Sequence, residues 1–180
     1  ATAQIRATGD ISLSALTRFI NQSTAANVLS SSAGSWRVYS GNLNPFSPNT
    51  GDQTGALNHQ FRAYKYQPTS AVNDLHTFVL PGQNGLVYRF APQVILEPTT
   101  PIVKAYDGTT AVNPALLNFS LSAGVNGDRL TLSGTPSGQF ETVNASTTTM
   151  AISGLQLSAV DSANKPVFGY AFTPSVEATI

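Results

Sequence analysis

Apolar and small polar residues alternate along most of this chain, and this alternation limits its fold more than any other feature. In residues 11–16, Ile11, Leu13 and Ala15 would point to one side of an extended strand, and the intervening serines to the other. We find no convincing stretch with the 3.6-residue apolar period of an amphipathic helix. The sequence therefore predicts an all-β protein.

The low charge of the chain agrees with this fold class and argues against several functions. Charged residues make up 10% of the 180 residues, against about a quarter in an ordinary soluble domain. Nine basic and nine acidic residues give a net charge of zero. Because no basic excess is available to replace phosphate counterions, we expect no nucleic-acid partner. No window of about 18 apolar residues occurs, so we expect no membrane insertion.

Cysteine is absent, which removes disulfides, thiolate metal sites and cysteine nucleophiles together. A disulfide-free extracellular β protein is more typical of bacteria than of animals. Residues 1–6 have neither the basic nor the apolar region of a signal peptide. If the protein is secreted, we expect this chain to be a mature fragment or an excised piece.

The strand pattern changes near two closely spaced prolines, Pro98 and Pro101, and predicts two segments, 1–97 and 98–180. A stretch rich in Gly, Asn and Pro, residues 41–58, is predicted to be a long loop. Several glycines beyond the boundary, including Gly134, Gly138 and Gly154, are interpreted as turns between short strands. The predicted strands are residues 4–8, 11–16, 17–22, 26–30, 36–40, 61–66 and 86–90 in the first segment, and 102–106, 118–121, 129–133, 150–157 and 167–173 in the second.

Three elements of the first segment, in matching order, carry a resemblance to a family of long bacterial exoproteins. Residues 34–40, Gly-Ser-Trp-Arg-Val-Tyr-Ser, are similar to the G-R-W-L-V-Y-S element of the haemagglutinin-like proteins of two-partner secretion. Residues 61–66 are similar to the F-x-x-Y-x-x-x-Y region of that family, and residues 84–88 to its G-N-G-L-I-Y strand. The resemblance implies the end of a right-handed parallel β-helix with a capping region.

The second segment resembles the YDG domain that follows this element in many of the same adhesins. The signature stands at residues 104–110, Lys-Ala-Tyr-Asp-Gly-Thr-Thr, and residues 152–157 are similar to the V-S-G-L-x-L strand of that domain. Residues 162–170 depart from the usual A-G-N-Y-x-L ending. This resemblance implies a small antiparallel, β-sandwich-like domain.

Taken together, the two resemblances imply a secreted or cell-surface adhesin segment on the exterior of the outer membrane. Its partners would be the rest of the same long exoprotein and a host-cell glycan or protein receptor. The last coil of a β-helix has an open backbone edge that needs a cover. We expect a core of aromatic residues to form that cap, composed of Trp36, Tyr39, Phe61, Tyr64 and Tyr88.

The chain offers few residues for catalysis or for metal and cofactor binding. Its two histidines, His59 and His76, lie in polar connecting stretches and match no zinc or nucleophile–base spacing, so we interpret them as surface residues. The acidic residues are scattered, although folding can bring two carboxylates together unseen in the sequence. We predict no catalytic, cofactor or metal site, and a protein that is not an enzyme.

The alternation of rings and cations in residues 61–66 is the best candidate for a binding surface. Alternation places Arg62, Tyr64 and Tyr66 on one side of the strand, opposite Phe61, Ala63 and Lys65. We expect that side to be exposed, most simply without a ligand, with glycan binding by Arg62, Tyr64 and Tyr66 as the alternative.

Two short motifs of the second segment read as turns. Asp107-Gly108 and Asn126-Gly127-Asp128 have the residues that turns require, and calcium binding at these aspartates is the weaker interpretation. Lys104 occupies a first-strand position that isopeptide lysines use in other adhesin domains, but no matching asparagine occurs in residues 168–179.

Three functions follow from these observations. The leading hypothesis is a non-enzymatic adhesin segment that spaces and presents a larger exoprotein and contributes to host-cell attachment. The alternatives are a carbohydrate-binding module that uses exposed aromatic residues and a fragment of an extracellular hydrolase.

Overall fold

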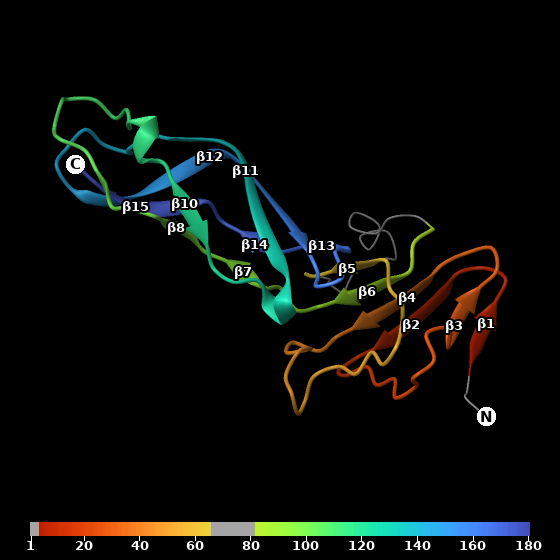
Figure 1. The fold of residues 1–180 in the computed structure, drawn as a ribbon. Helices are drawn as coiled ribbons and strands as arrows, with labels where there is room; N and C mark the ends of the chain where they lie inside the picture. The colour runs from red at the N-terminus through yellow and green to blue at the C-terminus, as the bar shows by residue number, and fades with distance from the viewer. Residues whose placement is uncertain (1–3, 66–81) are drawn as a thin grey trace. The chain divides into compact units, whose positions relative to one another are not determined.

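The computed structural model describes residues 4–65 and 82–180, and these residues form strands, turns and loops with almost no helix (Figure 1). The prediction of an all-β protein is confirmed. Two single 3₁₀ turns, Pro114–Leu116 and Val125–Gly127, interrupt the strands. No helix among the described residues is long and apolar enough to cross a membrane.

Two compact units divide the chain, and each is built from segments that are separate in sequence. The first unit contains residues 1–92, 125–128 and 159–171, and the second contains residues 93–124, 129–158 and 172–180. The chain therefore returns twice to the first unit after residue 92.

Parallel pairing dominates the first unit (Figure 1). Strand β1 pairs with β3, and a ladder runs β2, β4, β6, β5 and β13, with each neighbouring pair parallel. The strands of this unit are β1 (Ile5–Ala7), β2 (Ile11–Ala15), β3 (Leu29–Ser31), β4 (Trp36–Ser40), β5 (Phe61–Ala63), β6 (Gly85–Tyr88) and β13 (Pro166–Phe168).

Both faces of this ladder are covered, which explains the nearly continuous burial of β4, β5 and β6. One face carries a core that includes Trp36, Tyr64 and Tyr88, and the other carries a smaller core with Tyr39 and Phe61. The predicted burial of these five aromatic residues is confirmed, but they form two clusters instead of one cap core.

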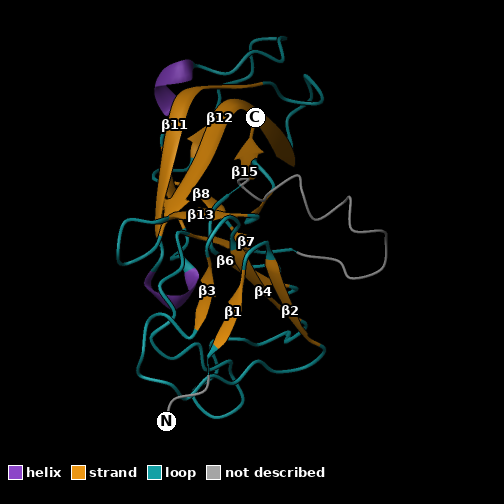
Figure 2. Ribbon diagram, turned by 90° about the vertical axis from the view of Figure 1, so that its right-hand side faces the viewer, coloured by secondary structure: helices purple, strands orange, loops and turns teal. Residues whose placement is uncertain are grey.

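Antiparallel pairs predominate in the second unit, where the longest strands, β11 and β12, lie side by side (Figure 2). Strand β8 pairs with β10 and β12 pairs with β15, in both cases antiparallel, whereas β9 runs parallel to β15. The remaining strands are β7 (Gln93–Val94), β8 (Leu96–Pro98), β9 (Ile102–Val103), β10 (Phe119–Leu121), β11 (Arg129–Gly138), β12 (Thr147–Val160), β14 (Ala171–Phe172) and β15 (Ser175–Thr179).

Several predicted boundaries are wrong for identifiable reasons. Gly134 and Gly154 lie inside β11 and β12 with positive φ angles of 97° and 77°, and the strands continue past them, whereas β11 does end at Gly138. Residues 17–22 make only an isolated bridge at Ile20. Strand β8, which pairs with β10 through Leu96, Glu97 and Pro98, runs across the position of the predicted boundary between residues 97 and 98.

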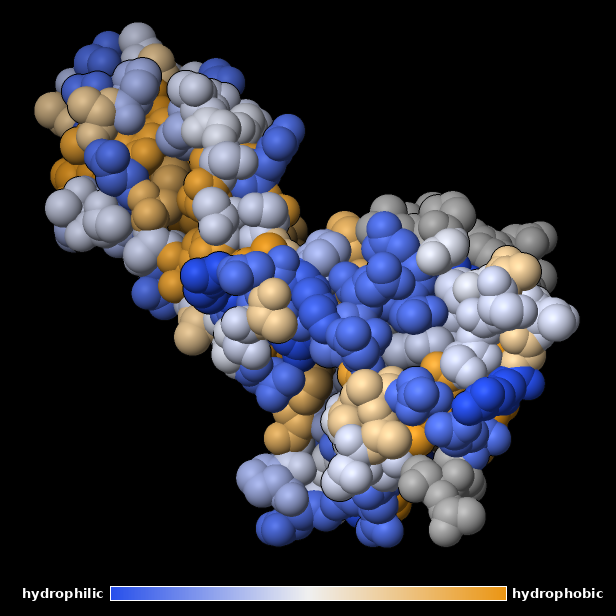
Figure 3. Space-filling view, turned by 45° about the vertical axis from the view of Figure 1, so that its right-hand side comes forward, coloured by the Kyte–Doolittle hydropathy of each residue, from blue (hydrophilic) through white to orange (hydrophobic). Residues whose placement is uncertain are grey.

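The face in Figure 3 shows near-neutral side chains between strongly hydrophilic ones, with some apolar residues among them. This mixture agrees with a chain in which only 10% of the residues are charged. A surface of this kind relies on Ser, Thr and Asn for its polarity.

Candidate functional site

A charged cluster is buried in the first unit, and Arg62 of β5 is at its centre. In the register of the parallel ladder, Arg62 stands opposite Leu86 and Val167, in a row that continues through Val38 to Leu13. Only 4% of Arg62 is exposed. A guanidinium group in a row of aliphatic side chains requires partners, because burying an unpaired charge is costly.

Asp128 is the main partner of Arg62. It follows the turn at residues 125–127, is 6% exposed, and accepts a hydrogen bond from Nη2 of Arg62 through Oδ1. The other carboxylate oxygen accepts from the hydroxyls of Tyr64 and Tyr170, each at 2.8 Å. The Tyr170 hydroxyl in turn accepts from the backbone N–H of Val125 at 2.9 Å. Both oxygens of Asp128 are therefore engaged.

Asp161 approaches Arg62 from a tight turn that connects β12 to β13. Its Oδ1 accepts from the backbone N–H groups of Ala163 and Lys165 at 2.8 and 2.9 Å, which fixes the carboxylate in place. Its Oδ2 lies 2.9 Å from Nε2 of His59 and 3.8 Å from Nε of Arg62. The turn thus links a histidine and an arginine through one oxygen.

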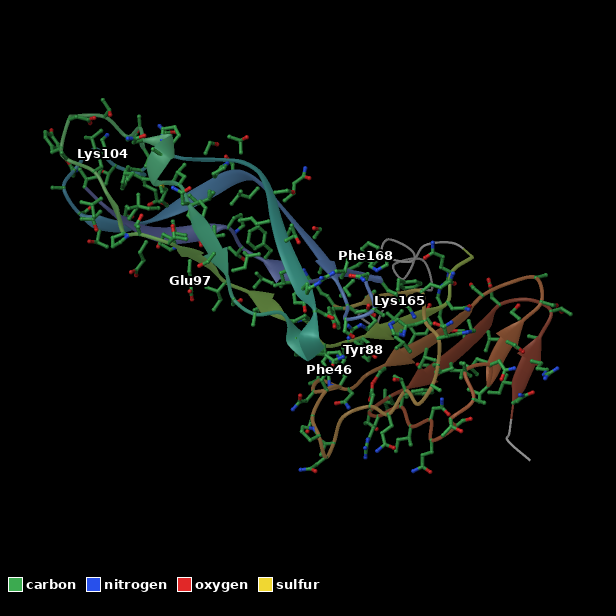
Figure 4. The ribbon with its side chains drawn as sticks, viewed as in Figure 1. Phe46, Tyr88, Glu97, Lys104, Lys165 and Phe168 are labelled. Carbon is green, nitrogen blue, oxygen red and sulfur yellow. The ribbon has the colours of Figure 1, made fainter. Side chains whose placement is uncertain are left out.

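The ring of Phe46 lies over the guanidinium group and packs against further aromatic rings. The predicted loop at 41–58 contains no strand, and it places Phe46 with its ring centroid 5.8 Å from Cζ of Arg62. The ring centroids of Phe46 and Tyr88 are 5.3 Å apart, and both side chains are labelled in Figure 4. Tyr64 meets Tyr170 edge to face at 5.2 Å. The rings limit the access of water to the charged cluster, and the electrostatic interactions among its charged groups are stronger for that reason.

Burial determines most of the protonation behaviour of the cluster. Desolvation raises the pKa of Tyr64, Tyr88 and Tyr170, so all three hydroxyls remain neutral. Desolvation also lowers the pKa of His59, more than the hydrogen bond to Asp161 raises it.

The two carboxylates shift in opposite directions. Burial raises the pKa of Asp128 despite its hydrogen bonds and the charge of Arg62. Burial acts in the same direction on Asp161, but the hydrogen bonds from Lys165, His59 and Ala163 together outweigh it and lower the pKa of Asp161.

A pocket of about 290 Å³ opens beside this cluster within the first unit. Arg62, His59 and Asp161 line it together with Asp52 and the rings of Phe46 and Tyr88. Oδ1 of Asp52 accepts from the backbone N–H of Phe19 at 3.1 Å and from Nδ2 of Asn42 at 3.0 Å. The pocket is therefore polar, with charges of both signs at its wall.

Placement of Arg62 and Tyr64 on one side of β5 is correct, but the expectation that this side is exposed is wrong. Only 1% of Tyr64 is exposed, because β5 lies inside a ladder that is covered on both faces. The strand ends at Ala63, and Lys65 adopts a positive φ of 64°. Tyr66 and His76 lie outside the described residues. His59 is half-buried and paired with Asp161, which corrects its interpretation as a surface residue.

The turn at Asp107-Gly108 is confirmed. Oδ1 of Asp107 accepts from the backbone N–H of Thr109 at 2.8 Å, and Gly108 has a φ of 70°. Lys104 forms an ion pair with the same carboxylate at 2.7 Å and also donates to the carbonyl oxygen of Thr109. Hydrogen bonds from Lys104 and Thr109 lower the pKa of Asp107 to about 2. The lysine and the aspartate of the YDG signature therefore form one local unit.

The motif at 126–128 is also a turn, because Asn126 has a φ of 51° and Asp128 donates its N–H to the carbonyl of Val125 at 2.9 Å. Asp128 itself is buried in the charged cluster, where Arg62, Tyr64 and Tyr170 engage both of its carboxylate oxygens. In residues 4–65 and 82–180, no three His, Cys, Asp or Glu side chains converge in a way that could hold a metal ion.

Sequence reasoning missed the acidic partners of Arg62. Asp128 and Asp161 lie 66 and 99 positions beyond Arg62 by residue number, so no local spacing connects them to it. One local signal was available for Asp161: an aspartate in a turn commonly accepts the backbone N–H two positions later, as Asp161 does from Ala163.

Comparisons with known proteins identify one domain. Residues 91–170 match the YDG domain family, and the match includes the signature turn at Asp107-Gly108 as well as Asp128, Asp161 and Tyr170 of the charged cluster. No curated protein and no solved structure matches the chain. The resemblance of the first segment to haemagglutinin-like exoproteins remains a prediction. The chain therefore contains a YDG domain, at residues 91–170.

Proposed function

We propose that this chain is a non-enzymatic structural segment of a large bacterial adhesin, composed of the end of a right-handed parallel β-helix followed by the YDG domain. It would hold the rest of the exoprotein away from the cell and contribute to attachment to a host glycan or protein. It would be located at the cell surface or be secreted.

One observation carries this proposal: three successive segments near the N-terminus each pair in parallel with one of three later segments, and the two sets follow the same order along the chain. Ile5 pairs with Leu29, Ile11 with Trp36, and Ile20 with Gln53. Stacked coils produce this order, because each strand of one coil pairs with the corresponding strand of the next coil. Hydrogen bonds from Asn21 to Thr54 and from Phe19 to Asp52 follow the same order.

A cover for the last coil is the second support. The ladder continues from β4 through β6 to β5, and the outer edge of β5 pairs with β13 from the YDG match. Parallel edges that lack a cover are prone to pair with other chains. A strand contributed by the following domain would prevent that at this end of the stack.

A hydrolase fragment is less well supported. A glycosidase needs a protonated acid and a free carboxylate across a cleft. The hydrogen bonds on Asp161 hold it in its ionised form, and both oxygens of Asp128 are occupied. Among the described groups, Nδ1 of His59 has no hydrogen-bonded hydroxyl that it could activate as a nucleophile.

Surface display provides the direct test. An antibody raised against this chain should label intact, unpermeabilised cells of the source bacterium, and external protease should remove the signal. A cytoplasmic protein detected in the same cells is the control, because it should be labelled only after permeabilisation. Labelling of the chain only after permeabilisation would contradict the proposal.

A further inference from the structure

We propose that the pocket beside Arg62 binds a single uncharged, polyhydroxylated ring, such as a hexose or a cyclic polyol. This inference goes beyond the proposed structural role and does not depend on it, because a spacer segment can fold with or without a ligand in this pocket.

Three buried polar atoms that form no hydrogen bond carry the inference. Within the described part of the chain, Nε of Arg62, Nδ1 of His59 and Oδ2 of Asp52 are buried and form no hydrogen bond. All three residues line the same pocket. An unsatisfied buried polar atom typically costs about 1–3 kcal/mol, so three at one cavity indicate that something else satisfies them.

The chemistry of these atoms defines the ligand. Nε of Arg62 can only donate, and Oδ2 of Asp52 can only accept while the carboxylate is ionised. The other nitrogen of His59, Nε2, lies 2.9 Å from the carboxylate of Asp161, so it carries the proton and Nδ1 accepts. The ligand must therefore accept one hydrogen bond and donate two, and hydroxyl groups do both.

Charge excludes simpler ions. Two carboxylates, Asp52 and Asp161, and one guanidinium group line the pocket. An anion would face both carboxylates at short range. A simple cation would leave the Nε–H of Arg62 without an acceptor. A neutral ligand with several hydroxyls meets all three requirements without adding a charge.

Size and shape indicate one ring. A volume of about 290 Å³ is at the lower end of the range for ligand pockets, which starts at about 300 Å³. Phe46 and Tyr88 provide aromatic surface for the C–H face of a sugar, and the same Phe46 ring stands over Arg62. The wall thus combines a stacking surface with donors and acceptors.

The test is a titration of the whole chain, followed by NMR chemical shifts, with glucose, galactose, mannose and myo-inositol as probes. We expect saturable binding of at least one probe with a Kd in the millimolar range, and shift changes confined to residues that line the pocket. Alanine and inorganic sulfate are the comparison ligands, since one is a zwitterion and the other an anion. A methyl glycoside of the best probe distinguishes the end of a glycan from a free sugar, and binding of either form supports the proposal.

Asp52→Asn is the critical variant, because its amide oxygen can keep the bonds to Phe19 and Asn42 while the acceptor that faces the pocket becomes a donor. We expect it to weaken binding at least fivefold without changing the melting temperature by more than a few degrees. Asp107→Asn, in the exposed turn of the second unit, should leave binding unchanged. The proposal fails if no probe binds, if alanine or sulfate binds more tightly than every probe, or if the shifts map outside the pocket.

Discussion

Arg62 and Asp128 show how one buried pair can specify a core that is otherwise apolar. Arg62 takes a place in a row with Leu86 and Val167, where an aliphatic residue would pack more simply. Burying two charges costs several kcal/mol each, and the pair offsets this only with well-placed hydrogen bonds. Tyr64 and Tyr170 provide those bonds to Asp128. Removing one partner should therefore be worse than replacing both.

Asp128→Ala leaves the guanidinium group of Arg62 buried without its main partner, since Asp161 lies 3.8 Å away. We expect the free energy of unfolding to fall by about 3–5 kcal/mol, measured by urea denaturation. The double variant Arg62→Met/Asp128→Leu should lose less than this single variant. A loss below about 1 kcal/mol in Asp128→Ala would contradict the structural role of the pair.

His59 makes the stability of the first unit depend on pH. Burial lowers its pKa below the usual 6.5, so the unfolded chain binds the proton more readily than the folded one. The contribution of neutral His59 is present above pH 6.5 and is lost as the pH falls through its folded-state pKa.

Between pH 7.5 and pH 5, lowering the pH should therefore destabilise the original chain relative to His59→Gln, as measured by the difference between their melting temperatures. Asp128, whose raised pKa acts in the opposite direction, is present in both proteins and cancels in this comparison. Asp161, whose pKa is also lowered, acts only at more acidic pH, below its ordinary 3.8, and does not mask this window. Parallel pH profiles of the two proteins would contradict the effect.

Asp107 and Lys104 give a local test of the YDG signature. NMR titration of the Asp107 carboxylate should give a pKa of about 2 in the original chain. In Lys104→Met, which removes the ion pair at 2.7 Å, the pKa should move toward its ordinary value of 3.8. An unchanged titration in the variant would show that Lys104 does not hold this carboxylate.

At the scale of elements, alternation predicted strands well where they are short and straight, and failed where glycine lets a strand bend. Residues 36–40 form a strand as predicted. The predicted strand 129–133 stops before Gly134, through which β11 continues to Gly138, and the predicted strand 150–157 is three residues short at each end of β12. The pattern of β5 gave the correct sides for Arg62 and Tyr64, but a single strand cannot reveal that both of its faces are covered. Their acidic partners come from distant turns, which local patterns do not connect.

Gly154 provides a prediction for the bent strands. Its φ is 77°, and an added Cβ would lie 2.2 Å from the carbonyl oxygen of Thr135 in β11. We expect Gly154→Ala to destabilise the chain by about 1–3 kcal/mol in thermal or urea unfolding. Gly9→Ala is the matched control, because nothing lies within 4 Å of its added Cβ, and should change stability by less than about 0.5 kcal/mol. Equal effects of the two substitutions would contradict the requirement for glycine at Gly154.

At the scale of the whole molecule, the family match and the compact units do not coincide. The YDG match covers residues 91–170, yet residues 125–128 and 159–171 belong to the same compact unit as the segment before the match. These two returning segments bring Asp128, Asp161 and β13 to the first unit. Part of the YDG sequence therefore completes the core of the segment before it and covers the edge of its ladder.

Native-state hydrogen exchange, followed residue by residue across low urea concentrations, tests this claim most directly. The amide of Tyr64, which donates to the carbonyl of Phe168 at 2.9 Å, should open with the same free energy as amides of β4, β6 and residues 159–168. Amides in residues 147–157, which belong to the second unit, serve as the comparison group. The account is wrong if the amides of residues 159–168 open with the same free energy as those of residues 147–157 and with a different free energy from those of β4 and β6.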